Sequence, residues 1–279
     1  MIHIHAYAKI NLYLEVIGKR EDGYHEIESI MQSISLSDTV SLSKSESGIE
    51  IVSSDLRIPT NEKNTAYHAA QLFFDKTGIK QGIRIEIKKN IPIAAGLAGG
   101  SADAAATLFG MNKLFNTGLS ESDLLVLAAD VGSDVSFCLV GGTCRCRGRG
   151  ELVDKIADLP PTWFVLVKPD FGISTKWVYE NFDLVFIKEK RLVGTHVPTT
   201  AIHLYNDLEK VVIPKYTVVQ DIKKKLIQLG CLQATMTGSG PTVFGMAKDE
   251  GAANKIFQEM KKEYPQSFLV KSASSGLMV

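Results

Sequence analysis

Residues 91–109, IPIAAGLAGGSADAAATLF, place glycine, alanine and one serine at the start of a predicted helix. Gly96, Gly99 and Gly100 have no Cβ atoms, so consecutive backbone N–H groups can point at one centre where the chain turns. The helix adds unpaired N–H groups and the positive end of its dipole. This combination predicts a phosphate-binding loop, and the alternative is a tight turn that packs a helix closely on a sheet.

The loop matches neither of the two common nucleotide-binding motifs. No Gly-Lys-Ser/Thr closes it, as a Walker A loop requires, and no strand-bound acidic residue follows at the spacing of a dinucleotide site. A nucleotide site at this position would therefore belong to a different class.

Cysteine and histidine give little support for a metal site. The cysteines form no CxxC pair, and only two of them are close enough to share a strand face. Without a second pair of ligands, this pattern favours structural or free thiols. His3 and His5 share a strand face with no acidic third ligand nearby, so we interpret them as a polar face. We expect no structural metal. The cysteines in question are Cys138, Cys144, Cys146 and Cys231.

Length and charge limit the class of protein. The chain has 279 residues, 45% of them hydrophobic, with 31 Lys plus Arg against 31 Asp plus Glu. This length favours two domains, and a net charge of zero provides no field to attract nucleic acid or an anionic membrane. The N-terminus alternates like a strand, unlike a signal peptide, and no apolar run approaches the ~18 residues of a membrane span. We expect a soluble cytoplasmic protein with no nucleic-acid or membrane partner.

The first half of the chain mixes strands and helices without a strict βαβ rhythm, which indicates an α+β fold. A polar, glycine-containing turn at 18–25 separates two strands, and period-two alternation predicts further strands at 39–54 and 82–90. Helical spacing with a terminal glycine predicts helices at 64–78, 101–118 and 120–132, the last two starting at serine.

After Pro160 and Pro161 the pattern restarts with an apolar strand, WFVLVKP. This restart predicts an N-terminal domain at 1–158 and a C-terminal domain at 159–279. Helices and strands then alternate, which suggests a small α/β sandwich closing against the first domain. The expected elements are a helix from about Ser174, a polar stretch near 185–200, a helix at 216–230, two strands within 234–247, a helix at 250–264 and a strand at 267–274.

Three stretches resemble one superfamily. Residues 92–106, PIAAGLAGGSADAAA, are similar to the phosphate-loop motif of the GHMP kinases. Residues 8–32 resemble the N-terminal motif of the 4-diphosphocytidyl-2-C-methyl-D-erythritol kinase family, and residues 237–245 resemble the C-terminal glycine motif. The motifs occur in order across the whole chain. Lys-Ile-Asn-Leu followed by Asp-Gly-Tyr-His separates this family from mevalonate, homoserine and galactose kinases.

The resemblance implies a two-domain GHMP kinase fold, with a first domain like domain 2 of ribosomal protein S5, a ferredoxin-like second domain and an active site between them. It implies phosphorylation by ATP of the 2-hydroxyl of 4-diphosphocytidyl-2-C-methyl-D-erythritol, in the non-mevalonate isoprenoid pathway. Another GHMP small-alcohol kinase, of mevalonate or homoserine type, and a non-catalytic nucleotide sensor are the alternatives. Lys9 and Asp134 argue against the sensor, and Tyr24 with His25 argues against other acceptors.

Phosphoryl transfer requires charge neutralisation around the moving group and a base for the alcohol proton. Asp134 follows a predicted helix end and falls where the family has its catalytic aspartate. Lys9 shares a strand face with Asn11, and the family pattern points Lys9 at Asp134 and the acceptor hydroxyl. An ammonium there favours the ionised carboxylate and the developing alkoxide. From the residues alone, a helix N-cap and an edge-strand lysine are the simpler interpretations.

The resemblance also implies how the two substrates bind. Tyr24 can stack on cytosine and His25 can hydrogen-bond its edge, although a turn followed by a half-buried strand also fits these residues. Thr175 and Tyr179 lie one helical turn apart and can reach one ligand, with core packing as the alternative for Tyr179. Asn11, Gly238 and Ser239 complete the predicted acceptor-substrate set.

For ATP, the resemblance points to Asn64 and Lys89 near the adenosine, where a helix cap and a solvated strand end are the alternatives. Mg²⁺ would enter with the nucleotide. Ser101 and Asp103 are within reach of the phosphates by sequence, but no metal motif appears, so we assign no protein ligand. We expect a monomer or a weak homodimer. The predicted phosphate-binding residues are Pro92, Ile93, Ala94, Ala95, Gly96, Leu97, Ala98, Gly99, Gly100, Ser101 and Ala102.

Overall fold

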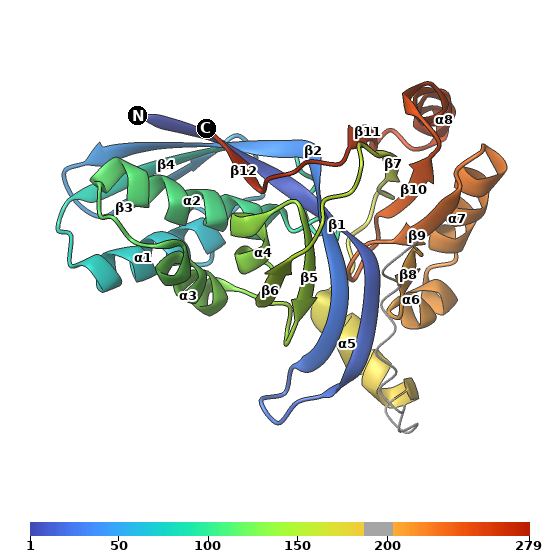
Figure 1. Ribbon diagram of the computed structural model, residues 1–279, viewed down its shortest axis with the longest axis horizontal. Helices are drawn as coiled ribbons and strands as arrows, with labels where there is room; N and C mark the ends of the chain where they lie inside the picture. The colour runs from blue at the N-terminus through green and yellow to red at the C-terminus, as the bar shows by residue number, and fades with distance from the viewer. Residues whose placement is uncertain (187–202) are drawn as a thin grey trace.

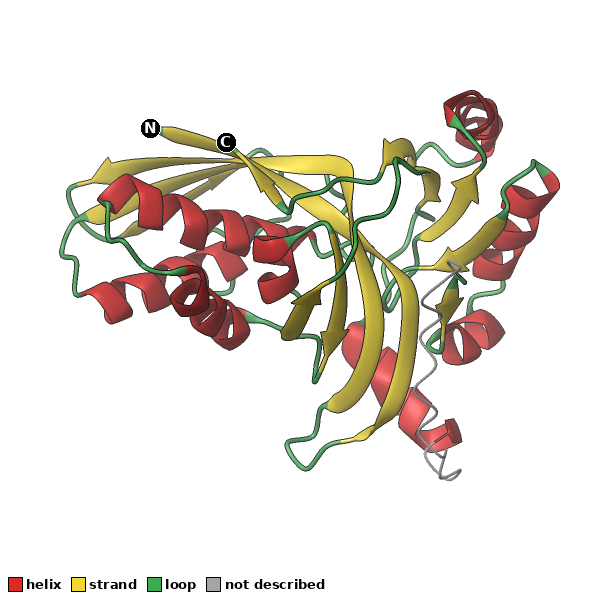
Figure 2. Cartoon of the chain, viewed as in Figure 1, coloured by secondary structure: helices red, strands yellow, loops and turns green. Residues whose placement is uncertain are grey.

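The structure, a computed structural model, describes residues 1–186 and 203–279. Its strands form two sheets, and α1–α4 gather on one side of the larger sheet (Figures 1 and 2). The mixture of helices and strands agrees with the predicted α+β class. The predicted polar stretch near 185–200 lies, from residue 187 onward, outside the described residues.

The larger sheet has the described strand order β12-β1-β2-β4-β3, with β5 pairing with β2 and β6, and β8 pairing with β1. Its pairs are antiparallel except β3 with β4 and β8 with β1. The strands are β1 (Ile2–Lys19), β2 (His25–Ser45), β3 (Ile49–Ser53), β4 (Gly82–Lys88), β5 (Thr143–Arg147), β6 (Leu152–Lys155), β8 (Tyr205–Asn206) and β12 (Leu277–Met278).

One edge of β1 is the place where distant loops meet. β2 runs along one side of β1, while the other side pairs with β12 before Lys9 and with β8 after Asn11. Between these two short strands, the Lys9 N–H donates to the Leu97 carbonyl (3.2 Å) and the Asn11 N–H to Thr237 Oγ1 (3.0 Å). The predicted phosphate loop and the C-terminal glycine loop therefore both attach to the same stretch of β1.

The helices of the first half cover one face of this sheet. The small residues of α2 allow a close approach: a Cβ on Gly110 would lie 2.1 Å from Leu42 Cδ1 and 2.7 Å from Ile4 Cδ1. The buried alanines of α2 lie between the sheet and the neighbouring helices, because α2 contacts β1, β2, α1 and α4. The bounds are α1 (Thr65–Thr77), α2 (Gly99–Phe115), α3 (Glu121–Val131) and α4 (Val135–Val140).

The predicted bounds of α2 were wrong at both ends. The helix begins at Gly99 rather than Ser101, because Ala98 takes a left-handed conformation (φ 58°) and its carbonyl accepts the Ala102 N–H. It ends before Asn116, which adopts a left-handed conformation (φ 52°), rather than at Gly118, where the sequence predicts the end of the helix. Asn tolerates that conformation better than most residues with a side chain.

The smaller sheet has the order β11-β7-β10-β9, and α7 and α8 contact it from one side (Figure 1). Its strand β7 is apolar on both faces: Phe164 and Leu166 join the core of the larger sheet, and Val165 and Val167 join the core under α7 and α8. This double burial explains the continuous apolar run WFVLV. The bounds are β7 (Trp163–Val167), α5 (Thr175–Phe186), α6 (Glu209–Lys215), α7 (Val218–Gln228), β9 (Gln233–Met236), β10 (Val243–Ala247), α8 (Glu250–Glu263) and β11 (Ser267–Lys271).

The smaller sheet begins at Trp163, close to the proposed boundary between residues 158 and 159. β8 and β12 nevertheless return to the larger sheet, so the later part of the chain supplies strands to both sheets. The boundary itself stays a prediction. Among the described helices, none has the length and apolar character that crossing a membrane requires.

The four cysteines are free thiols in the protein interior. Cys144 and Cys146 share the buried face of β5, as the two-residue spacing predicts for a strand. Burial raises the pKa of the Cys144 and Cys231 thiols to about 12, so both are protonated at neutral pH. Within the described residues, no three His, Cys, Asp or Glu side chains are arranged to hold a metal ion.

Candidate active site

A cleft of about 920 Å³ opens at the unpaired stretch of β1. It is lined by the β1–β2 turn, the residues before α1, the loop leading into α2, the start of α4, the first turns of α5 and the C-terminal glycine loop. Every residue that the sequence predicts for the site lines this cleft except Ala102. Ala102 is fully buried and its N–H already donates to the Ala98 carbonyl, so neither its side chain nor its amide is available to a ligand.

Lys9 is a buried residue of an interior strand, not an edge lysine. Its side chain is 4% exposed, and Nζ donates to Asn11 Oδ1 (2.7 Å) and the Gly96 carbonyl (3.1 Å). Asn11 is held in turn by Ser29 Oγ, which accepts from its Nδ2 (2.9 Å). These contacts fix the ammonium at the junction of β1 and the phosphate loop.

Asp134 stands at the N-cap position of α4, as the simpler sequence interpretation holds, but its side chain makes no capping hydrogen bond. The carboxylate faces Lys9 instead, with Oδ2 3.6 Å from Nζ, and is 30% exposed. At this distance the two charges attract without a short hydrogen bond, which leaves room for a substrate hydroxyl beside the carboxylate. The arrangement suits proton abstraction next to a fixed positive charge.

The loop before α2 has an unusual backbone. Ala94, Gly96 and Ala98 all have positive φ (50°, 75° and 58°), so the chain alternates between left-handed and other conformations. Successive N–H groups in such a backbone can form a concave anion site, next to the free N–H groups of the first turn of α2. Gly96 is required for close contact, since a Cβ there would lie 2.2 Å from the Thr237 carbonyl.

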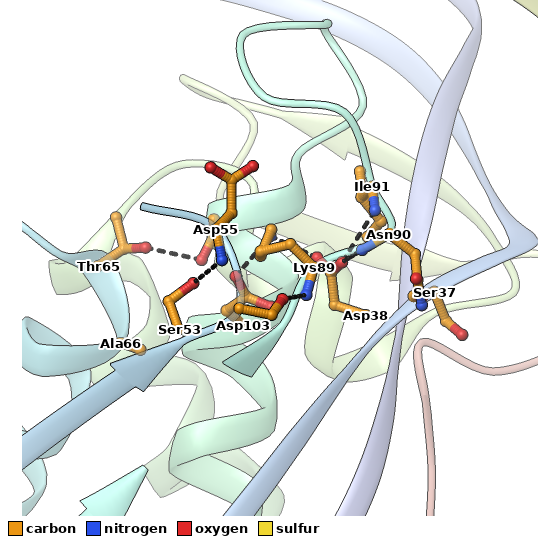
Figure 3. A network of polar contacts seen from close by, with 12 residues as sticks. Ser37, Asp38, Ser53, Asp55, Thr65, Ala66, Lys89, Asn90, Ile91 and Asp103 are labelled. Atoms are coloured by element: carbon orange, nitrogen blue, oxygen red, sulfur yellow. Dashed lines mark hydrogen bonds and ion pairs between the residues drawn. The ribbon is translucent and has the colours of Figure 1, made fainter. Parts of the chain in front are cut away.

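Lys89 lies in a buried ionic network below the loop (Figure 3). Its side chain is 5% exposed, and Nζ contacts the carboxylates of Asp38 and Asp103, at 2.7 Å for Asp103 Oδ2. Burial opposes its charge, but the two carboxylates outweigh it and raise the Lys89 pKa. Lys89 is therefore not the solvated strand end that the sequence left open.

Asp38 ties this network to the backbone of the loop. Its Oδ1 accepts the N–H groups of Asn90 (2.6 Å) and Ile91 (2.9 Å), the residues that lead into the loop (Figure 3). Asp103 projects from the second turn of α2, and its Oδ1 has no hydrogen-bond partner among the described residues. Burial raises the Asp103 pKa, and the charge of Lys89 opposes that shift.

Asn64 caps α1, as its alternative interpretation holds. Its Oδ1 accepts the Ala66 N–H (2.9 Å) and its Nδ2 donates to the Pro59 carbonyl (2.7 Å). Both polar groups of the amide are thus used within the protein, although the residue lines the cleft with Pro59 and Lys63. Asn64 shapes this wall of the cleft through the segment it holds.

The opposite wall carries aromatic side chains. Tyr24 is 53% exposed, and the buried His25 ring stacks on Tyr179 with 4.8 Å between ring centroids. His25 Nε2 also lies 2.5 Å from Asp183 Oδ1. Burial and the charge of Asp134 raise the pKa of the Tyr179 hydroxyl, which is therefore protonated at neutral pH.

Sequence reasoning missed Asp183, which accepts from His25 and pairs with Lys19 (2.5 Å). A signal was present: Asp183 follows Tyr179 by four residues, as Tyr179 follows Thr175, so all three lie on one face of α5. Burial opposes its charge, but Lys19 and His25 outweigh it and lower the Asp183 pKa.

The C-terminal glycine loop closes the cleft over Lys9. Gly238 has a positive φ of 54°, and a Cβ there would lie 3.2 Å from Lys9 Nζ. Ser239 Oγ and Thr175 Oγ1 are 2.8 Å apart, which joins this loop to α5. Asn206 Nδ2 donates to the Gly238 carbonyl (2.9 Å) and supports the loop from β8.

Comparison with known proteins gives consistent matches. The family models for the GHMP kinases N terminal domain and the GHMP kinases C terminal match residues 64–142 and 198–266. The 4-diphosphocytidyl-2-C-methyl-D-erythritol kinase of Clostridium acetobutylicum is 44% identical, with 97% of this chain and 100% of that protein covered. The protein of the same name from Caldanaerobacter subterraneus is 43% identical, with 100% and 99% covered.

Solved structures agree. A crystal structure of 4-(cytidine 5'-diphospho)-2C-methyl-D-erythritol kinase matches with a TM-score of 0.82 and 29% identity, covering 98% of this chain and 99% of that one. The homoserine kinase of Cytophaga hutchinsonii shares the fold, with a TM-score of 0.72, 24% identity and coverage of 99% and 96%. On its 44% identity over nearly its whole length, the chain belongs to the 4-diphosphocytidyl-2-C-methyl-D-erythritol kinase family of the GHMP kinases, which are ATP-dependent phosphotransferases.

Proposed function

We propose that this chain transfers the γ-phosphoryl group of ATP to the 2-hydroxyl of 4-diphosphocytidyl-2-C-methyl-D-erythritol, giving the 2-phosphate and ADP in the non-mevalonate isoprenoid pathway. The observation that carries the proposal is the pair Lys9 Nζ and Asp134 Oδ2, 3.6 Å apart, in a cleft that also contains the glycine-rich loop and the exposed Tyr24 ring. One cleft thus offers a base, a cation, a phosphate loop and an aromatic platform.

In the proposed reaction, Asp134 takes the proton of the 2-hydroxyl as the oxygen attacks the γ-phosphorus of ATP. The bond from the γ-phosphorus to the bridging oxygen breaks, and ADP leaves with that electron pair. Lys9, held by Asn11 and Gly96, stabilises the negative charge that develops on the attacking oxygen. The fixed pair of Lys9 and Asp134 would position the acceptor hydroxyl for attack. Such positioning supplies much of the catalysis in phosphoryl transfer.

The ATP phosphates are proposed to bind the loop from Pro92 to Ser101. The positive φ angles at Ala94, Gly96 and Ala98 allow N–H groups to converge there, and the start of α2 adds its dipole. Lys89 lies beneath the loop, where its ion pairs with Asp38 and Asp103 hold the residues that lead into it. The adenosine would extend toward Asn64, whose hydrogen bonds hold that wall.

The cytidine is proposed to bind at the other wall. Tyr24 offers its ring for stacking, and His25 Nδ1, which has no hydrogen-bond partner among the described residues, is available to the base edge. With Asp183 accepting at Nε2, the proton of a neutral His25 resides on Nε2 and leaves Nδ1 as an acceptor for the cytosine amino group. Mevalonate and homoserine have no base to use these contacts.

Mg²⁺ is proposed to enter with ATP. The residues fit a metal carried mainly by phosphate oxygens, because Asp103 Oδ1 is an unpartnered buried oxygen and Ser101 offers a hydroxyl at the same helix start. Bound there, Mg²⁺ would neutralise phosphate charge. A cytoplasmic location and a monomer or weak homodimer also remain part of the proposal.

The proposal is tested by measuring ADP release from Mg-ATP with 4-diphosphocytidyl-2-C-methyl-D-erythritol, mevalonate and homoserine as acceptors. Turnover is expected with the cytidine substrate alone. Turnover of mevalonate or homoserine at comparable kcat/KM would instead assign a different GHMP acceptor. Equal activity on methylerythritol phosphate without cytidine would contradict base recognition, and no turnover with any acceptor would favour a nucleotide sensor.

A further inference from the structure

The proposed acceptor contains a diphosphate, and none of the residues assigned above binds it. Its diphosphate lies between the cytidine, placed at Tyr24, and the 2-hydroxyl, placed at Asp134. A diphosphate diester carries negative charge, and a partly enclosed cleft favours a cation beside it. The position for that cation is therefore between Tyr24 and Asp134.

The turn between β5 and β6 occupies this interval. The guanidinium carbon of Arg149 lies over the Tyr24 ring, 4.8 Å from its centroid. The next residue, Gly150, borders the catalytic carboxylate: a Cβ built there would lie 3.7 Å from Asp134 Oδ1 and 3.7 Å from Ser133 Cβ. One short turn thus contacts Tyr24 and borders Asp134, and Arg149 lines the cleft.

The Arg149 side chain has donors to offer. It is 26% exposed, and its one hydrogen bond to the described residues runs from Nη2 to the Ala129 carbonyl (3.3 Å). Glu151 lies 3.8 Å from Nε, beyond hydrogen-bond distance, and its other oxygen accepts the Arg149 backbone N–H (2.6 Å). Most of the five guanidinium N–H groups are therefore free for a phosphate, whose oxygens match the planar fork of arginine.

Other cations that line the cleft are less suited. Lys63 lies beside Asn64, at the wall proposed for the adenosine. Lys19 is committed to Asp183 (2.5 Å), and Lys89 is buried between two carboxylates. Lys176 is 83% exposed, lies 3.8 Å from Glu180 and touches no aromatic ring among the described contacts. Lys9 faces Asp134 at the reacting end. Arg149 alone among these combines partial burial with contact to the Tyr24 ring.

We propose that Arg149 binds the diphosphate of the acceptor substrate, with its guanidinium holding the ring of Tyr24 on one side and phosphate oxygens on the other. This inference rests on the proposed function, because that function places the two ends of the substrate. It adds a positioning contact: by fixing the diphosphate, Arg149 sets how far the 2-hydroxyl reaches toward Asp134. The sugar and base would bind without it, but less firmly anchored.

The test compares CDP with cytidine as ligands of the full chain in calorimetry, with the ATP site filled by a non-hydrolysable ATP analogue and Mg²⁺. The wild type is expected to bind CDP more tightly than cytidine. Arg149→Met should weaken CDP binding roughly 10- to 100-fold, the range for a lost charge-assisted contact, and change cytidine binding less than about threefold. Arg149→Lys should recover part of the CDP affinity because it keeps the charge but not the fork.

Lys176→Met is the matched control. It also removes one cation that lines the cleft, but Lys176 has no contact with an aromatic ring or a backbone carbonyl among the described contacts. Its CDP affinity should stay within about threefold of wild type. If Lys176→Met and Arg149→Met lost CDP affinity equally, the positive charge of the cleft as a whole would attract CDP, and a specific contact with Arg149 would be overturned. If Arg149→Met lost CDP and cytidine affinity equally, Arg149 would act only through Tyr24, and the proposed contact with the diphosphate would be overturned. No loss of CDP affinity in Arg149→Met would overturn the contact as well.

Failure of the proposed function gives a different result. If the wild type binds UDP as tightly as CDP, the assignment of the cytosine site fails, while the difference between CDP and cytidine still reports on Arg149. In steady-state assays, Arg149→Met should raise KM for the acceptor and leave KM for ATP unchanged. A rise in KM for ATP alone would place the arginine in the other subsite and contradict the inference.

Discussion

At the scale of single residues, Asp134 and Lys9 form the centre of the site. Asp134→Ala removes the proposed base but leaves the loop before α2 intact, because Asp134 has no described contact with that loop. We expect kcat to fall roughly 100- to 10,000-fold while the affinity for ATP is unchanged. Single-turnover assays and calorimetry with an ATP analogue measure the two effects, and near wild-type kcat would remove Asp134 from the mechanism.

Asp183 gives a prediction at the same scale that depends on pH. Its pKa is lowered in the folded protein, so its contribution to stability is present above the unfolded pKa of about 3.9 and is lost as the pH falls through the lower folded value. Asp183→Asn should lower Tm at pH 7 by roughly 2–4 °C, about 1 kcal/mol, and raise KM for the acceptor by disturbing His25.

Thermal unfolding at several pH values tests Asp183. The difference from wild type should shrink below about pH 3.9, where the unfolded carboxyl group becomes protonated. Asp130→Asn, an exposed change on α3, serves as the control and should leave Tm unchanged. A Tm difference that stays constant down to pH 2 would show that Asp183 acts through packing rather than through its charge.

Residues close together in the sequence could be predicted, and those paired over long separations could not. The period of two placed Lys9 and Asn11 on one face, and the two do form a hydrogen bond. Asp38 and Lys89 are 51 positions apart and meet only because β2 pairs with β4, so no local pattern indicated their contact. Arg149 was missed for the same reason, since its partner Tyr24 lies in the distant turn between β1 and β2.

At the scale of elements, the start of α2 carries the phosphate loop. Gly99→Val would place a Cβ 3.0 Å from Ile91 Cγ2 and 3.2 Å from Lys89 Nζ, so the residues that lead into the loop must shift. We expect ATP-analogue binding to weaken at least tenfold and CDP binding to change little, because CDP binds at the other wall. Calorimetry with each ligand measures this order.

Gly251→Val is a suitable control for the Gly99 variant. The position lies on α8, away from the cleft, and a Cβ there makes only an ordinary contact, 3.5 Å from Asp249 Oδ1. It should leave the binding of both ligands unchanged. A Gly99→Val protein that loses CDP affinity more than ATP affinity would contradict the assignment of the two walls.

Most elements could be predicted because they carry local signals. α1 has its Asn64 cap and left-handed Gly78, and α3 has a capping box at Ser120 with Gly132 after its end. The β5–β6 hairpin, β8, α6 and β12 were not predicted. β8 and β12 have two residues each, too few for a periodic pattern, and their existence depends on the edge of β1 that receives them.

At the scale of the whole molecule, the cleft depends on segments from both halves of the chain meeting at β1. Gly276 precedes β12, and its carbonyl accepts the Tyr7 N–H (2.9 Å). A Cβ at Gly276 would lie 2.0 Å from the Cys138 carbonyl oxygen, in the helix that Asp134 begins. Gly276→Val should therefore destabilise the protein by roughly 1–3 kcal/mol and displace α4.

Urea unfolding measures the stability of Gly276→Val, and kcat reports the displacement of Asp134. Val279→Ala is the control, since Val279 is 69% exposed and the change should stay within about 0.5 kcal/mol. An unchanged unfolding midpoint in Gly276→Val would show that β12 is not part of the cooperative unit. If Gly276→Val lost much stability but kept its kcat at low temperature, Gly276 would be needed for folding and not for the position of Asp134.

The return of the C-terminal residues to β1 has a consequence for synthesis of the protein on the ribosome. β1 is translated well before β8, β12 and the glycine loop that contacts Asn11, which come from residues 205–278. The emerging chain must therefore keep this edge of β1 unpaired until residues 205–278 have been made. An exposed strand edge invites pairing with other chains, so nascent and prematurely terminated chains are expected to be the species that chaperones bind.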